Sequence, residues 1–251
     1  MADSKNMQNS REASVMVVIP ARDEAKALPE LIPDIPPIVD RVIVVDNGSL
    51  DNTAQVARDL GADVLQVPEA GYGRACLVGS QHAIRLGADI IVYLDADRSD
   101  FPEQMNRLIE PIESGAADLV IGSRALGHCA RGALTVQQRF GNRLACFLIR
   151  RIWNFQYTDL GPFRSVRSAV FGDLEMKEMT YGWTVEMQIK ALQQGLRVRE
   201  VATDYRRRIG KSKISGTVKG VILAGYCILR VIAVSGRRRD RTDYAASAKS
   251  A

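Results

Sequence analysis

The sequence predicts an α/β protein with a mostly parallel central sheet flanked by helices, and three observations lead to this prediction. Short β-branched apolar runs recur along the first half of the 251-residue chain. A segment with the apolar spacing of a helix follows almost every run, which is the pattern of βαβ units. The runs are nearly apolar throughout, as in strands buried on both faces of a parallel sheet.

The elements follow in order along the chain. Strands are predicted at 15–19, 41–45, 63–67, 89–94 and 118–121. Helices are predicted at 26–31, 52–60, 73–86 and 102–114. The second half adds helical patterns at 137–155 and 182–194, a strand-like alternation at 197–201 and an apolar, amphipathic C-terminal helix at 216–235.

Composition limits the class of protein. Apolar residues make up 46% of the chain and charged residues 25%, so a sizeable core is expected and wholesale disorder is excluded. The net charge of +5 is uneven, because residues 206–241 hold eleven Lys or Arg and one acidic residue, Asp240. The rest of the chain is net negative, which argues against a nucleic-acid binder and for one basic C-terminal surface.

Cysteine usage and the termini predict the environment of the protein. The four cysteines form no CxxC pair and the chain has two histidines, so neither a zinc site nor a disulfide framework is expected and a reducing compartment fits. We expect residues 1–13 to be a disordered tail without a signal peptide. No stretch of about 18 uncharged apolar residues occurs, so no membrane-spanning helix is expected. The predicted organisation is the tail, a domain at 14–215, and an interfacial helix with a basic tail at 216–251.

The strongest chemical motif is Asp95-Ala96-Asp97, directly after the apolar run IIVYL. Two carboxylates at positions i and i+2 of a strand end can turn toward one hard cation such as Mg²⁺ or Mn²⁺, which commonly also binds a diphosphate. The alternative is a solvated acidic turn that begins the next helix.

Three further polar segments follow predicted strands. Asp46 in DNGSLD could accept a hydrogen bond from a nucleobase or ribose, or this segment could be a turn that caps a helix. Glu24 in PARDE could be only a first-turn helix acid. The two glycines of GYGR suit a tight turn or a close backbone approach to a ligand. Ligands of such sheets bind at the carboxyl ends of the strands, where all four segments lie.

Together, these segments resemble the family 2 inverting glycosyltransferases of the GT-A fold, and most closely the polyprenyl- or dolichyl-phosphate mannose and glucose synthase branch. The resemblance runs from about Val15 to Thr217. The matching segments are VVIPARDEA, VIVVDNGSLDNT, GYGRA, YLDADRSDFPE, ADLVIGSRALG, TDLGPFRSVRS, YGWTVEMQIKA and RRRIGKSKISGT.

The resemblance implies a Rossmann-like GT-A sheet, a nucleotide-sugar donor and a divalent metal, Mg²⁺ or Mn²⁺. The implied donor-binding residues are Pro20, Arg22, Glu24, Asp46, Gly73, Asp95, Ala96, Asp97 and Lys211. The implied metal ligands are Asp95, Asp97 and Ser99, with Ser99 in place of the glutamine that the family often has. Asp97, Arg208 and Lys213 are the implied catalytic residues, because the basic segment closes over the diphosphate in the resembling enzymes; the alternative is a solvated basic face.

The acceptor is expected to be a polyprenyl phosphate. Arg124, Arg139 and Arg143 lie at positions where the lipid-phosphate branch places arginines, and guanidinium groups suit a phosphate. The alternative is a helix with a basic exposed face. A phosphate acceptor needs no general base, whereas a hydroxyl acceptor would need one. Glu186 on the acceptor side, or Asp100, would then be that base, and Asp159 is equally well a structural residue.

The predicted activity is therefore inverting transfer of a hexose from UDP-glucose or GDP-mannose to a polyprenyl phosphate, a hexosyltransferase reaction. The C-terminal segment, with basic residues around a short apolar run, predicts peripheral contact with the cytoplasmic face of a membrane. It could instead pack on the domain or form a homo-oligomer interface. The competing functions are transfer to a soluble or other lipid hydroxyl, and nucleotide-sugar binding without catalysis.

Overall fold

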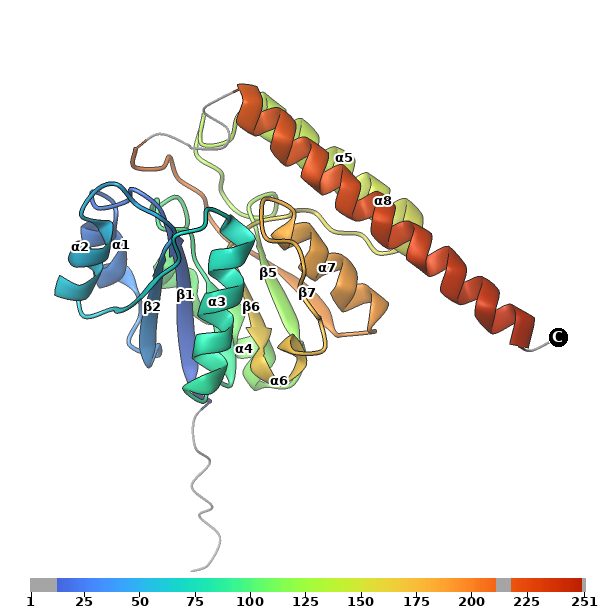
Figure 1. Cartoon of the computed structure of the whole chain (residues 1–251), viewed down its shortest axis with the longest axis horizontal. Coiled ribbons are helices and arrows are strands. Elements are labelled where there is room, and N and C mark those ends of the chain that lie inside the picture. The colour runs from blue at the N-terminus through green and yellow to red at the C-terminus, as the bar shows by residue number, and fades with distance from the viewer. Residues whose placement is uncertain (1–12, 211–217, 250–251) are drawn as a thin grey trace, which may run out of the picture.

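The computed structural model describes residues 13–210 and 218–249, and it confirms the mostly parallel α/β architecture. Seven strands form one sheet in the order β3-β2-β1-β4-β6-β5-β7 (Figure 1). Their bounds are Val15–Ala21 (β1), Arg41–Asp46 (β2), Asp63–Gln66 (β3), Ile90–Tyr93 (β4), Leu119–Ser123 (β5), Arg164–Arg167 (β6) and Val198–Ala202 (β7). Every neighbouring pair is parallel except the two that involve β6.

Helices cover both faces of the sheet. They are α1 (Leu28–Leu31), α2 (Thr53–Asp59), α3 (Tyr72–Arg85), α4 (Asn106–Glu113), α5 (Val136–Trp153), α6 (Ser168–Phe171), α7 (Trp183–Gln193) and α8 (Val218–Lys249). Short 3₁₀ turns occupy Ile32–Asp34 and Pro102–Gln104, so the segment 102–114 is a 3₁₀ turn followed by α4 rather than one continuous helix.

The core has two halves, one on each face of the sheet. Val15, Val17 and Ile19 of β1 pack with α1, α2 and α4, while Met16 and Val18 pack with α3, α5 and α7. Alternate side chains of one strand therefore reach opposite cores, which explains why the strand runs are apolar without alternation.

The sequence does not predict the antiparallel strand β6, because three of its four residues, RSVR, are polar. Arg164 is fully buried there, and its guanidinium donates to the carbonyl of Thr184 at 2.9 Å and to Gln188 Oε1 at 3.3 Å. Burial lowers the pKa of Arg164, and these acceptors offset part of the cost of desolvation. The strand occupies the space between β4 and β5.

The carboxyl ends of β1, β2 and β4 lie at the same edge of the sheet, because these strands are parallel neighbours. The loops after them contain the polar segments that the sequence singled out. This edge is the site expected for a ligand in an open α/β sheet.

Helices α5 and α8 lie side by side on the outer side of the domain (Figure 1). Gly236 of α8 lies against Ile152 near the end of α5. No helix within 13–210 or 218–249 combines the length and apolarity needed to cross a bilayer. The predicted tail at 1–13, except its last residue, and the junction at 215–216 lie outside the described residues.

Candidate active site

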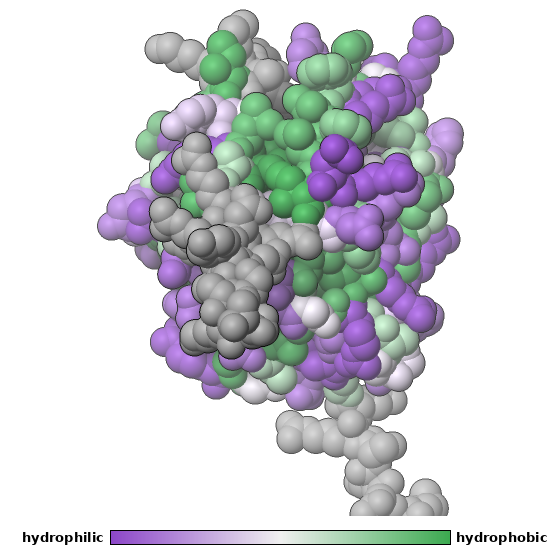
Figure 2. Space-filling view, turned by 90° about the vertical axis from the view of Figure 1, so that its right-hand side faces the viewer, coloured by the Kyte–Doolittle hydropathy of each residue, from purple (hydrophilic) through white to green (hydrophobic). Residues whose placement is uncertain are grey.

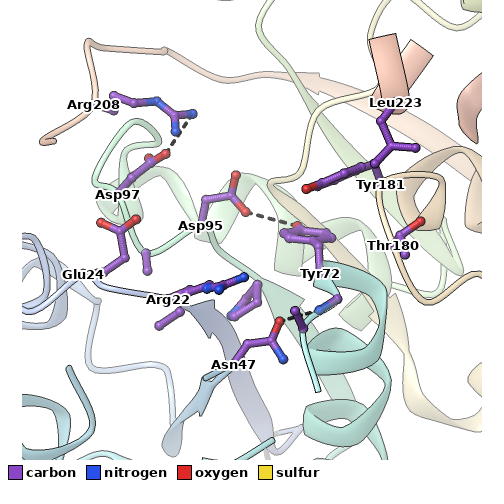
Figure 3. A pocket seen from close by; sticks show the side chains of 15 residues that line it. Arg22, Glu24, Asn47, Tyr72, Asp95, Asp97, Thr180, Tyr181, Arg208 and Leu223 are labelled. Carbon is purple, nitrogen blue, oxygen red and sulfur yellow. Dashed lines mark hydrogen bonds and ion pairs between the residues drawn. The ribbon is translucent and has the colours of Figure 1, made fainter. Parts of the chain in front are cut away.

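The carboxyl ends of β1 and β4 form one wall of a cavity of about 290 Å³ (Figure 3). The loop before α3, the loop before α7 and Leu223 of α8 complete the wall. The polar lining residues are Arg22, Glu24, Asn47, Tyr72, Asp95, Asp97, Thr180, Tyr181 and Arg208. Three carboxylates and two guanidinium groups therefore converge on a space that a diphosphate would fit. We call it the acidic cavity.

Asp95 and Asp97 follow β4 and both face the acidic cavity. Asp95 Oδ1 accepts a hydrogen bond from the Tyr72 hydroxyl at 3.1 Å, and its other oxygen points away from Tyr72 (Figure 3). Burial, together with the nearby charge of Asp97, raises the pKa of Asp95 to about 6. Asp97 Oδ1 accepts the backbone N–H of Ser99 at 2.9 Å, which fixes the second carboxylate within the loop.

Arg208 reaches the acidic cavity from the segment after β7. Its guanidinium lies 2.9 Å from Asp97 Oδ2, and the N–H of Ile209 donates to the Asp97 carbonyl at 2.9 Å. Burial opposes the charge on Arg208, but Asp97, Tyr205 and Asp95 together outweigh it and raise the pKa of the guanidinium. Arg208 therefore remains a cation beside the carboxylate pair.

The donor set suits a hard divalent cation. Of the three carboxylates at the cavity wall, those of Asp95 and Asp97 lie two residues apart, and their oxygens are of the kind that Mg²⁺ and Mn²⁺ prefer. No group of three or more His, Cys, Asp or Glu side chains that could hold a metal occurs in the described part of the chain. A cation bound here would thus take its other ligands from water and from a ligand such as a diphosphate.

Most of the predicted donor-side residues meet at this cavity. Those that line it are Pro20, Arg22, Glu24, Asp95, Ala96, Asp97 and Arg208. Asp46, Gly73 and Ser99 do not line it. Lys211 and Lys213 lie outside the described residues.

The three predicted residues that miss the cavity have structural contacts instead. Asp46 Oδ1 accepts the N–H of Ser49 at 3.0 Å, as a turn residue would. The N–H of Gly73 donates to the carbonyl of Thr180 at 3.2 Å. Ser99 is fully buried, and its carbonyl accepts the N–H of Arg206 at 2.8 Å.

Sequence reasoning missed Asn47, Tyr72 and Tyr181 as lining residues. The amide of Asn47 joins the loops after β2 and β3: its Nδ2 donates to the carbonyls of Val67 and Glu69, and its Oδ1 accepts the N–H of Gly71. Within DNGSLD the sequence singles out Asp46 rather than Asn47, and within GYGRA it singles out the glycines rather than Tyr72. Tyr181 begins the matching segment YGWTVEMQIKA, but the sequence alone assigns it no role.

A second, larger cavity of about 1040 Å³ opens between α5, α8 and the loops after β5 and α5. Arg139 and Arg143 line it from α5, and Arg124 lines it from the loop after β5. Its apolar lining includes Leu134, Val136, Phe140, Leu144, Leu160, Ile228 and Leu229. We call it the arginine cavity, because it combines guanidinium groups with a long apolar wall.

Arg124 is fixed rather than free. Its Nε and Nη2 donate to the two oxygens of Asp159 at 2.7 and 2.8 Å, a bidentate ion pair. Burial opposes the charge on Arg124, but Asp159 raises its pKa above the ordinary value. The guanidinium also stacks over the ring of Tyr205, 5.0 Å from its centroid. Asp159 thus positions Arg124 at the cavity wall.

The two acids weighed as general bases line neither cavity. The buried carboxylate of Glu186 accepts the N–H of Lys177 at 3.0 Å and of Glu178 at 2.7 Å, and it pairs with Lys190 at 2.9 Å. Asp100 is fully buried, and desolvation raises its pKa well above the ordinary value. The structure therefore brings Arg124, Arg139 and Arg143 together but leaves Glu186 apart from them.

Comparisons with known proteins show the family of this chain. The family model of glycosyl transferase family 2 matches residues 16–173. An uncharacterized glycosyltransferase of Mycobacterium tuberculosis is 33% identical over 84% of this chain and 94% of that protein. A dolichyl-phosphate hexose transferase of Haloferax volcanii is 31% identical over 86% of this chain and 92% of that protein. An undecaprenyl-phosphate mannosyltransferase of Micrococcus luteus is 29% identical over 82% of this chain and 89% of that protein.

Solved structures share the fold. Glucosyl-3-phosphoglycerate synthase from Mycobacterium tuberculosis, crystallised with Mn²⁺, UDP-glucose and phosphoglyceric acid, superposes with a TM-score of 0.69. The match covers 89% of this chain and 80% of that one at 19% identity, which confirms the GT-A fold. The segment that the family model matches, residues 16–173, includes β1 from its second residue, β2, β4 and the Asp95–Asp97 pair of the acidic cavity. The chain therefore belongs to glycosyl transferase family 2.

Proposed function

We propose that this protein transfers a hexose from UDP-glucose or GDP-mannose to a polyprenyl phosphate, with inversion at the anomeric carbon and assistance from a divalent metal. The observation that carries the proposal is that two chemically different cavities lie next to the same helix, α8. Leu223 of α8 lines the acidic cavity, while Ala224, Gly225, Ile228 and Leu229 line the arginine cavity. One cavity suits a nucleoside diphosphate, and the other suits an anionic head group with an apolar chain.

In the acidic cavity, Asp95 and Asp97 would hold Mg²⁺ or Mn²⁺, which supplies positive charge against the departing diphosphate. Arg208 adds a second cation beside the same carboxylates. Glu24 and Arg22 lie toward the carboxyl end of β1 and would contact the nucleoside part of the donor. Preorganised charges of this kind lower the barrier where negative charge develops.

In the arginine cavity, Arg139 and Arg143 lie one turn apart on α5 and would bind the acceptor phosphate. A phosphate oxygen attacks the anomeric carbon, a new C–O bond forms on the face opposite the leaving group, and the nucleoside diphosphate departs. The nucleophile is already anionic, so no general base is required. The positions of Glu186 and Asp100 outside the cavity linings support this acceptor over a hydroxyl.

Peripheral docking on the cytoplasmic face of a membrane is part of the proposal. On α5, Val136 is 80% exposed, Phe140 68% and Phe147 57%, and on α8 Ile222 is 67% and Tyr226 62% exposed. Val136 and Phe140 also line the arginine cavity. Segments 136–153 and 218–236 contain six Lys or Arg and no acidic residue. Figure 2 shows hydrophobic surface bordered by hydrophilic side chains on this side of the molecule. Such a face suits an anionic bilayer.

The test is a panel of radiolabelled UDP-glucose and GDP-mannose with Mn²⁺ and a short polyprenyl phosphate, followed by extraction of the product into organic solvent. We expect label in the lipid with one donor, and none when the matching polyprenol replaces its phosphate. Transfer to the polyprenol would favour a hydroxyl acceptor. Tight nucleotide-sugar binding without transfer to any acceptor would contradict the proposed catalysis.

A further inference from the structure

Residues 177–182 form a loop between the N-terminus of α3, the start of α7, and α8. The N–H groups of Gly73 and Arg74 donate to the carbonyls of Thr180 and Met179 at 3.2 and 3.0 Å. A Cβ atom on Gly73 would collide with the Glu178 carbonyl, so only glycine permits this close approach. The 177–182 loop therefore determines where α3 begins.

Glu186 holds the other side of this loop. Its buried carboxylate accepts the N–H groups of Lys177 and Glu178 at 3.0 and 2.7 Å, from one turn inside α7. Lys190 on the next turn of the helix neutralises the carboxylate at 2.9 Å. A buried carboxylate with these three donors fixes the backbone at 177–178 to the rigid helix.

Tyr72 connects the start of α3 to the acidic cavity. It lies between Gly71 and Gly73, and its hydroxyl donates to Asp95 Oδ1 at 3.1 Å. Figure 3 shows the ring beside Asp95, with the second carboxylate oxygen turned away from the tyrosine. The hydrogen bond thus selects one orientation of the Asp95 carboxylate.

We propose that Tyr72 and Glu186 are positioning residues for the donor site. Glu186 fixes the 177–182 loop, the loop fixes the start of α3, and Tyr72 there orients Asp95 toward a metal and a diphosphate. This inference rests on the proposed function and assigns Glu186 to the donor side, whereas the sequence placed it on the acceptor side. Partners that orient metal ligands contribute about 10- to 100-fold to metal affinity.

The chain offers a matched control in Glu200. This glutamate of β7 accepts the N–H groups of Thr158 and Asp159 at 2.9 and 3.0 Å. It therefore holds a loop as Glu186 does, but that loop lines the arginine cavity. A loss of general loop order would affect both glutamate variants alike, whereas the proposal affects them differently.

The experiment measures Mn²⁺ affinity by calorimetric titration in the presence of UDP and, separately, of GDP. The variants are Tyr72→Phe, Glu186→Gln, their combination, and Glu200→Gln, each checked for an unchanged circular dichroism spectrum. We expect about tenfold weaker Mn²⁺ binding for each of the first two variants. The double variant should be about as weak as the worse single variant, because both act through one path. Glu200→Gln should stay within about twofold of wild type.

Tyr72→Phe keeps the ring and removes only the hydroxyl, so it tests the proposal even if Glu186→Gln fails to fold. Wild-type affinity in Tyr72→Phe would overturn the proposal. The proposal would also be overturned if the losses of Mn²⁺ affinity in the two single variants multiplied in the double variant. It would be overturned as well if Glu200→Gln lost as much Mn²⁺ affinity as Glu186→Gln. If the wild-type protein does not bind Mn²⁺ in the presence of UDP or of GDP, the proposed donor site is contradicted, and this inference is contradicted with it.

Discussion

The acidic cavity and the arginine cavity are built differently. The first lies at the edge of the parallel sheet, where short loops after β1 and β4 place three carboxylates beside two guanidinium groups. The second is more than three times larger and lies mainly between two helices, with arginines and apolar side chains both in its lining. Strand ends hold charged side chains in well-defined positions. Two neighbouring helices instead leave an elongated groove between them.

The two cavities also share features. Each is bordered by one loop whose backbone N–H groups are held by a glutamate, the buried Glu186 on one side and the half-buried Glu200 on the other. Helix α8 contributes to both walls. If the comparison is right, changes in one cavity should alter donor binding, and changes in the other should alter acceptor binding.

The largest effect is expected for Asp97→Asn. The substitution keeps the size of the side chain but removes a charge that pairs with Arg208 and faces the metal position. Transfer measured with labelled donor should fall by about 10³-fold or more, at an unchanged melting temperature. Asp118→Asn is the control, because Asp118 directly precedes β5, pairs with Arg197 and does not line the acidic cavity. Wild-type rates in Asp97→Asn would show that the acidic cavity has no role in the transfer reaction.

Arg139→Ala tests the arginine cavity. Loss of one charge-assisted contact to phosphate should raise the KM for polyprenyl phosphate by about 10- to 100-fold and leave the donor KM within twofold. Arg151→Ala is the matched control, since this exposed arginine lies on the same helix but does not line the cavity. A rise in the donor KM instead would mean that Arg139 contributes to donor binding and not to acceptor binding.

The pH dependence should differ between the two cavities. Burial and Asp97 raise the pKa of Asp95 to about 6, so protons compete with the metal for this carboxylate at pH values below about 6. The affinity for Mn²⁺ with a nucleotide sugar should therefore decrease by about tenfold per pH unit below 6 and level off above it. In the other cavity, Asp159 raises the pKa of Arg124, so this guanidinium stays charged throughout this range. Calorimetric titration between pH 5 and 8 checks this, and a flat profile would contradict the burial of Asp95.

The smallest effect concerns the exposed face of α5. Phe140→Ser and Phe147→Ser should each weaken flotation with anionic liposomes by about fivefold, because each removes roughly 1 kcal/mol of apolar insertion. Leu86→Ser is the control, since this exposed leucine follows α3 far from that face. Equal losses for all three variants would mean that the α5 face has no special role in docking.

The sequence predicted the sheet and most of the donor-side residues that line the acidic cavity, because both depend on local patterns. Buried strands of a parallel sheet are apolar runs, and Asp95 and Asp97 lie at the end of such a run. Parallel pairing then brings the ends of β1, β2 and β4 together without further information.

The remaining features depend on contacts between distant residues. β6 is polar in sequence, and it is buried only because Arg164 finds acceptors on the loop before it and on α7. Glu186 was assigned to the acceptor because the carboxylate alone gives no sign of the backbone N–H groups that it binds. Tyr72 was overlooked for the same reason, since only the fold places its hydroxyl beside Asp95.

The most direct test of two separate sites is a cross-binding measurement by calorimetry. Wild type, Asp97→Asn and Arg139→Ala are each titrated with nucleotide sugar plus Mn²⁺ and, separately, with farnesyl phosphate. The account predicts that Asp97→Asn loses the donor but binds farnesyl phosphate normally, and that Arg139→Ala shows the reverse. Equal weakening of both ligands in either variant would contradict the division into a donor cavity and an acceptor cavity.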